Sequence, residues 1–527
     1  MRKLLMASAA VLGATGSLAM AQTPANPSQG QLAAPYGAGP ASNNNNNAWG
    51  IANTPSGSPA AGSLTSIYAP NVDAVPAPGT VVIRLNGRVE AEVTANYTSA
   101  DKTAAGATGT PGGYKVNPLG IASYMRLYPA FDGLAANGLR YGASVEIREN
   151  FTSGTYPGQL TGSSPTTTTL TTTPTAAATS PSSNTSGQTL FVRRAFSYLA
   201  TDQAGLVRLG QGDGVLGLFD NCIFTSQCWD AGSGGFNGGD IQSTGPQASL
   251  GIPFIWLSQA GAEYGNNKIV YLSPQFFGFD FGVQFAPSMG NSLQNSGAGV
   301  GCTQAGPTCI SVTSGTDPTR WYNQVGVGLR YQQSFGPIDF KAYGFYETAA
   351  KESVNYAAGS PNAAPATFAG RTTSNLRYDN LSFYKGGIAA TAYNVTFAAD
   401  YIGGQLGTSG QLAMRPAGAP SANAVVTGVT YANGPIALGA EYGFINGQGD
   451  PRLVGVSQRR EYEIAFGGSF KLAPGIQLIG EYMYMYRHQG DFNFNTGAVG
   501  GITAGAPLGA TRDAQSNNFL VGTVLTW

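Results

Sequence analysis

Apolar and polar residues alternate one by one over long stretches of this chain. The clearest stretch covers residues 80–97, and the same period of two returns at 139–148, 279–285 and 461–472. A β-strand directs successive side chains to opposite faces, whereas a helix would scatter such a pattern around its circumference. Each stretch therefore predicts a β-strand with one apolar face and one polar or charged face.

The connections between the predicted strands alternate in length. Short connections lie at 132–138, 201–204, 273–278, 335–337, 432–435 and 472–475. Long connections lie at 152–189, 212–262, 286–320, 350–378, 405–421 and 488–514. Counting the strands from Thr80 to Trp527 gives about sixteen, with strands of roughly ten residues typical of barrels that cross membranes.

Two-faced strands joined by short turns on one side and long loops on the other predict an all-β fold, a transmembrane antiparallel β-barrel. Hydrocarbon offers the backbone no hydrogen-bond partner, so a sheet can cross it only by closing on itself. The alternative is a soluble β-sandwich or propeller. Such a fold would turn its polar residues outward and would lack the rhythm of short and long connections.

Composition supports the membrane interpretation. Only 10% of the residues are charged, against about 25% in soluble globular chains. The formal net charge is zero, which gives no reason to expect a nucleic-acid partner. Tyr482, Tyr484 and Tyr486 share the outward face of one predicted strand, where amphipathic rings suit the headgroup level of a bilayer.

The chain divides into three parts. Residues 1–21 read as a secretory signal peptide, with Arg2 and Lys3 before a short apolar core and an A-x-A site at 19–21. Residues 22–79 are rich in Pro, Ala, Ser and Asn and predict a disordered periplasmic segment that precedes the barrel. Residues 80–527 form the predicted barrel.

The four cysteines form two local pairs in Gly-rich segments. Cys222 and Cys228 are six residues apart, and Cys302 and Cys309 are seven apart. An oxidising cell envelope favours two local disulfides, although three pairings are possible. Zinc binding is the weaker reading, because no histidine lies near either pair.

Several segments resemble the trimeric general porins of Gram-negative outer membranes. F-V-R-R-A-F-S-Y-L at 191–199 and G-L-V-R-L-G-Q-G-D-G-V at 205–215 resemble the strand pair that leads into the porin third loop. N-N-K-I-V-Y-L-S-P-Q-F-F-G-F-D-F-G-V-Q-F at 266–285 resembles the strands that follow it. The resemblance extends over 80–527; it omits 22–79, and the loops are long for the family.

The last nine residues, F-L-V-G-T-V-L-T-W, resemble the family's C-terminal assembly signal, although Phe is commoner at the final position. The resemblance implies that barrel assembly machinery reads this strand. Its outward residues would be Phe519, Val521, Leu525 and Trp527. The same strand is expected to be the sixteenth and to pair with the first.

The resemblance also implies a pore lined by opposed charges. In the family, the third loop folds into the barrel and faces a basic wall. Matching strand by strand assigns the wall to Arg84, Arg88, Arg126, Arg193, Arg208 and Lys268. The facing acids within loop 212–262 would be Asp220, Asp230 and Asp240, and a disulfide between Cys222 and Cys228 would stiffen this loop.

The expected function is a passive, water-filled channel for small hydrophilic solutes and ions in the outer membrane. Its expected partners are membrane lipid, two further copies in a homotrimer, and the assembly machinery. One alternative is a channel specific for sugars or organic acids, which inward-facing Tyr124, Tyr128 and Tyr343 would favour. Another is a non-conducting barrel whose long loops serve adhesion or act as a receptor.

We expect neither an enzyme nor a cofactor or metal site. The single histidine, His488, has no serine or acid partner that its spacing suggests. G-Q-G-D-G at 210–214 is superficially like a phosphate-binding loop, but no Lys-Ser or Lys-Thr completes it.

Overall fold

The structure is a computed structural model of the whole chain. It describes residues 78–99, 118–149, 190–201, 203–212, 214–219, 267–274, 276–288, 321–351, 379–406, 415, 419–447, 459–473, 475–490 and 513–527. The signal peptide, residues 22–77, the four cysteines and the three loop acids lie outside these residues, and their predictions stay untested.

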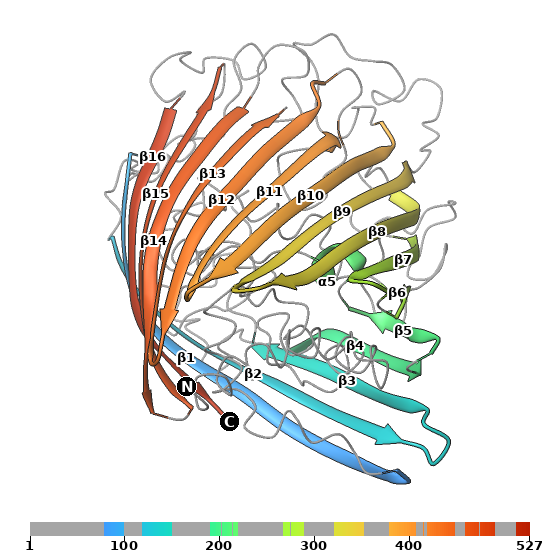
Figure 1. Cartoon of the computed structure of the whole chain (residues 1–527). Helices are drawn as coiled ribbons and strands as arrows, with labels where there is room; N and C mark the ends of the chain where they lie inside the picture. Colours follow the sequence, from blue (N-terminus) through green and yellow to red (C-terminus); the bar gives the residue numbers. More distant parts are fainter. Residues whose placement is uncertain are drawn as a thin grey trace, which may run out of the picture.

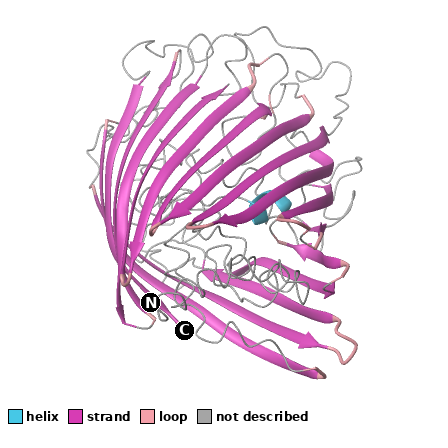
Figure 2. Ribbon diagram, in the orientation of Figure 1, coloured by secondary structure: helices cyan, strands magenta, loops and turns pink. Residues whose placement is uncertain are grey.

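The described residues form sixteen antiparallel strands that close into one barrel, with each strand paired to its neighbours in the chain. Figure 1 shows the strands, and Figure 2 shows how little other regular structure there is among the described residues. The first eight strands are β1 (Thr80–Thr98), β2 (Leu119–Leu134), β3 (Arg140–Glu149), β4 (Leu190–Thr201), β5 (Gly205–Gln211), β6 (Asn267–Leu272), β7 (Phe279–Ser288) and β8 (Trp321–Phe335). The other eight are β9 (Ile338–Lys351), β10 (Leu381–Ala392), β11 (Val395–Gln405), β12 (Ala422–Asn433), β13 (Ile436–Gly447), β14 (Arg459–Ala473), β15 (Ile476–Gln489) and β16 (Asp513–Thr526).

The barrel closes where the chain's last strand meets its first. β16 pairs with β1 from Arg88↔Thr526 to Thr98↔Ser516. Beyond that register, Gly87 and Trp527 exchange two backbone N–H···O bonds, each 3.2 Å long. The expected pairing of the sixteenth strand with the first is therefore confirmed, and the closure leaves neither strand with an unpaired edge along this register.

Short turns occur at the expected end of the barrel. One two-residue turn joins β10 to β11 through Tyr393 and Asn394, which both have positive φ (49° and 69°). Two such residues match a two-residue hairpin turn, whose backbone twist follows that of the strands. The sequence pattern had not singled out this turn, because Tyr-Asn is a less typical turn pair than the Gly- and Pro-containing connections.

The two faces of the sheet differ as the alternation predicts. Outward side chains are apolar and exposed, for example Ile83 (83%), Ile121 (81%) and Phe397 (64%). Inward side chains are buried, and many of them are charged. A face of exposed apolar side chains suits lipid rather than water. No helix in the described part of the chain has the length and apolar character needed to span a bilayer.

One short helix, α5 (Val215–Phe219), lies in the described residues and follows β5. It packs against β7, β8 and β9, and Figure 1 shows it beside β7 and β8. Val215, Leu216, Leu218 and Phe219 are all buried. The loop after β5 therefore begins inside the barrel, as the resemblance implied.

Candidate functional site: the charged inner wall

Three of the expected basic residues have described side chains, and all three lie on the inner face. Arg126 on β2, Arg208 on β5 and Lys268 on β6 are 3%, 2% and 3% exposed. Arg84 and Arg88 belong to β1 and Arg193 to β4, but their side chains lie outside what the structure describes. The expected pore acids Asp220, Asp230 and Asp240 also lie outside it.

The inner basic side chains are held by specific contacts. Lys268 Nζ donates to the carbonyl oxygen of Gly212 at 2.9 Å, just before α5. The guanidinium of Arg208 stacks over the ring of Phe196, 4.6 Å from its centroid. Arg330 on β8 makes a bidentate ion pair with Asp280 on β7, through Nε at 3.0 Å and Nη2 at 2.6 Å. These contacts hold the basic groups in defined positions on the wall.

The basic residues concentrate on one side of the barrel. We call the following inward side chains on β5 to β10 the basic arc: Arg208, Lys268, Arg330, Lys341 and Lys385. Within it, Lys341 Nζ and Lys385 Nζ lie 5.5 and 5.9 Å from the ring centroid of Tyr343. Lys385 also lies 3.9 Å from Asp400 on β11. The sequence reasoning had not assigned Arg330, Lys341 or Lys385 to the pore.

Two buried carboxylates, Asp280 and Glu347, lie among these basic residues on β7 and β9, but a larger group lies on other strands. We call the following inward side chains on β13, β14, β15 and β1 the carboxylate arc: Glu441, Glu461, Glu463, Glu481, Glu90 and Glu92. Glu461 is paired with Arg487, whose Nε lies 3.0 Å away. In the ring of sixteen strands, β15 and β7 are eight strands apart, so the centres of the two arcs face each other across the barrel.

The sequence contained a signal for the carboxylate arc. Glu90, Glu92, Glu461 and Glu463 sit at alternate positions on the charged faces of two predicted strands. Period-two alternation alone places them inside the barrel. The family resemblance, in contrast, predicts pore acids in the third loop and says nothing of these glutamates.

α5 is fastened to the inner wall by polar contacts at its start. The backbone N–H of Val215 donates to Gln284 Oε1 on β7. Gln284 Nε2 in turn donates to Glu347 Oε2 on β9 at 3.0 Å, and Gln324 Nε2 donates to Glu347 Oε1. Glu347 and Gln324 are both fully buried. The carboxylate of Glu347 therefore joins three strands and the helix in one hydrogen-bond chain.

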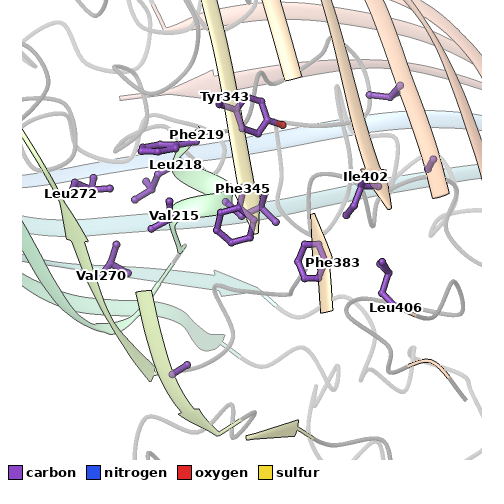
Figure 3. Close-up of a cluster of buried hydrophobic side chains, with 14 of the residues drawn as sticks. Val215, Leu218, Phe219, Val270, Leu272, Tyr343, Phe345, Phe383, Ile402 and Leu406 are labelled. Atoms are coloured by element: carbon purple, nitrogen blue, oxygen red, sulfur yellow. The ribbon is translucent and has the colours of Figure 1, made fainter. Parts of the chain in front are cut away.

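Apolar side chains complete the surface of the inner wall against which α5 packs. Figure 3 shows Leu218 and Phe219 between Leu272 of β6 and Tyr343 of β9, all members of one buried cluster. The guanidinium of Arg330 lies 4.5 Å from the centroid of the Phe219 ring. The ion pair with Asp280 holds that guanidinium in place, so the end of α5 contacts a charged residue of the wall, whereas its start contacts the neutral amide of Gln284.

The outward surface carries the expected aromatic groups. Tyr482 and Tyr486 donate hydrogen bonds across to Asn517 and Asp513 on β16, the first at 2.8 Å. Phe519, Val521, Leu525 and Trp527 are 46%, 62%, 42% and 47% exposed. Aromatic and apolar side chains on this face match a lipid-facing surface with polar partners near the headgroups.

His488 has an acid partner that sequence spacing did not suggest. Its Nδ1 lies 2.7 Å from Asp513 Oδ1, because β15 and β16 pair His488 with Asp513. Both residues lie on the outward face, with side chains 41% and 57% exposed. The pair is therefore on the opposite side of the sheet from the charged inner wall.

A closed barrel with an apolar outside and a charged inside defines a β-barrel channel that crosses an outer membrane. The sequence matches the family described as Gram-negative porin over residues 7–490. This chain belongs to the Gram-negative porin family and is an outer-membrane porin, a channel rather than an enzyme by family and fold.

Solved structures with a similar fold are distant. The anion-selective porin from Comamonas acidovorans is 15% identical, with 85% of this chain and 100% of that chain covered and a TM-score of 0.43. OmpT of Vibrio cholerae is 12% identical, with 86% and 100% covered and a TM-score of 0.42. Salmonella typhi OmpF in complex with daunomycin is 12% identical, with 84% and 97% covered and a TM-score of 0.43. A sequence comparison with curated proteins gave no match. The assignment to the porin family therefore rests on the match of the family model to residues 7–490.

Proposed function

We propose that this porin is a passive, water-filled diffusion channel for small hydrophilic solutes and ions. The observation that carries the proposal is the inner wall, where charged side chains occupy strand after strand while the outward face is apolar. Charged walls stabilise ions and dipolar solutes and penalise apolar ones. Planar-bilayer recording of the folded protein is the direct test. Single-channel conductance is expected, and a folded barrel that never conducts would refute the proposal.

The two charged arcs give this channel a transverse electric field. The carboxylate arc on β13–β15 and β1 lies across the barrel from the basic arc on β5–β10. A field between them orients dipolar solutes as they pass. Asp220, Asp230 and Asp240 stay candidates for additional acidic charge in the third loop, and Arg84, Arg88 and Arg193 for additional basic charge on the wall.

The assembly that we propose is a homotrimer in outer-membrane lipid, inserted by barrel assembly machinery that reads the last strand. Family membership supports the trimer, and the outward position of Phe519 and Trp527 supports a recognition role for β16. Stepwise closure of the conductance in threes is the expected result in a bilayer. Closure in single, unrelated steps would argue for separate barrels.

A substrate-specific channel is the second candidate, and Tyr343 is the residue that favours it. Its inward ring lies 5.5 and 5.9 Å from the ammonium groups of Lys341 and Lys385, and two cations beside an aromatic ring suit a planar organic anion. Tyr128 is also buried on the inner wall, but β2 and β9 are seven strands apart, too far for a continuous row of rings. Saturable block of the ionic current by one organic acid would favour this candidate.

A further inference from the structure

The surface of the inner wall beneath α5 contains a gap, which is open because two residues there are glycines. Gly282 on β7 and Gly328 on β8 are paired directly in the sheet. A Cβ added at Gly282 would lie 2.7 Å from Val215 Cγ1 and 2.8 Å from Val215 Cγ2. A Cβ at Gly328 would lie 2.8 Å from Val215 Cγ1 and 3.1 Å from Phe219 Cδ2. The two missing side chains therefore let α5 lie directly on the wall.

The hydrogen bonds beside this gap have a fixed direction. A carboxylate accepts hydrogen bonds and donates none, so Glu347 attracts the NH₂ end of the Gln284 amide. The carbonyl end of that amide is then turned towards α5, where it accepts from the N–H of Val215. Glu347 thus acts on α5 through Gln284, and its negative charge determines which end of the amide faces the helix.

We propose that Gly282, Gly328 and Glu347 are positioning residues that set how far α5 stands into the lumen, and thereby the width of the channel. The inference rests on the proposed function, because it requires that the loop beginning with α5 narrows a conducting pore. Any Cβ in the gap displaces α5 towards the axis. Any loss of the acceptor-only group at Glu347 releases the amide and, with it, the helix start.

The gap is tested by adding and removing methyl groups. Gly282→Ala and Gly328→Ala should each lower the single-channel conductance, by roughly 1.5-fold to 2-fold, because the pore is narrowed. Val215→Ala in the Gly282→Ala background should restore most of the conductance, since it removes the two methyl groups nearest to the new Cβ and leaves only Leu272 Cδ2, at 2.9 Å. Gly344→Ala is the matched control, because its Cβ would meet nothing within 4 Å. Conductance equal to the parent in both alanine variants would overturn the proposal.

The hydrogen-bond direction is tested by exchanging the two groups. Glu347→Gln should change the conductance and increase current noise, because the Gln284 amide can then turn its NH₂ towards the N–H of Val215. The double variant Glu347→Gln with Gln284→Glu places the carboxylate beside α5, where it accepts from both neighbours. This exchange should restore the parent conductance, whereas a purely structural role for the charge would leave the double variant as altered as the single one.

The conductance of the parent protein and that of its variants test the proposed function and the positioning role separately. A parent protein that folds but does not conduct would refute the proposed function. A conducting parent whose glycine and Glu347 variants conduct identically would refute only the positioning role. Thermal unfolding of each variant, followed by heat-dependent gel mobility, identifies variants that fail to fold, and the Val215→Ala and Gln284→Glu rescues keep the test decisive in that event.

Discussion

Replacing Asp280 with Asn should destabilise the barrel, because it removes the charge of one partner in a buried ion pair. Asp280 and Arg330 are both buried, at 1% exposure each, and the pair is bidentate with N···O distances of 3.0 and 2.6 Å. Asn keeps one acceptor oxygen but loses the charge and the second acceptor. Removing one partner of a buried ion pair costs about 3–5 kcal/mol, and the oxygen that Asn retains brings the expected loss to about 3 kcal/mol.

The assay is equilibrium unfolding in urea of the protein folded into phospholipid vesicles, followed by tryptophan fluorescence. Asp339→Asn is the matched control: Asp339 accepts from Ser334 Oγ at 2.6 Å near the β8–β9 turn, where the pair is exposed. Its loss should cost about 0.5 kcal/mol or less, as exposed polar contacts do. Adding Arg330→Met to Asp280→Asn should recover part of the loss, because it removes the buried charge that has lost its carboxylate. Equal midpoints for Asp280→Asn and Asp339→Asn would refute the reasoning.

Three further outcomes are expected. Glu463→Gln should shift the reversal potential in a salt gradient towards anion preference, and Lys341→Gln should shift it towards cation preference. Each variant should change the permeability ratio by roughly 1.5-fold, and shifts of the same sign would contradict the opposed arcs. Deleting Trp527 should lower the yield of inserted barrels in an assembly assay while the barrels that do insert keep their conductance. Tyr482→Phe should cost about 1 kcal/mol in the urea assay, because it removes the 2.8 Å hydrogen bond to Asn517; an unchanged midpoint would mean that the bond contributes nothing.

The barrel could be predicted from the sequence because its main determinant is local. Alternation over 80–97 states which side chains of β1 face inward, and the backbone requirement of a membrane then demands closure. The pairing of β16 with β1 followed from counting strands. Arg126, Arg208 and Lys268 were assigned to the inner wall through the family resemblance, and all three lie on the inner face.

The arrangement of the site could be predicted only in part. Alternation tells which face a residue lies on, but it does not tell which residues of distant strands face each other across the lumen. Gln284 is hydrogen-bonded to Glu347, which is 63 residues away in the sequence, and to Val215, which is 69 residues away. Both contacts depend on the register of β7, β8 and β9. Alternation predicts that the glutamates of the carboxylate arc face inward. That they face the basic arc follows only from the strand order, which places β15 opposite β7.

The width of the channel and its ion preference depend on different parts of the barrel. The charges of both arcs sit on the strands of the wall, whereas the described residues of α5 are apolar or glycine. Moving α5 should therefore change the width of the channel without changing which charges line it. Gly282→Ala is expected to lower the conductance at a constant reversal potential, and Glu463→Gln to move the reversal potential at a nearly constant conductance. If one variant changed both the conductance and the reversal potential, the constriction and the charged arcs would have to be a single structure. The assignment of width to α5 and of ion preference to the wall would then be wrong.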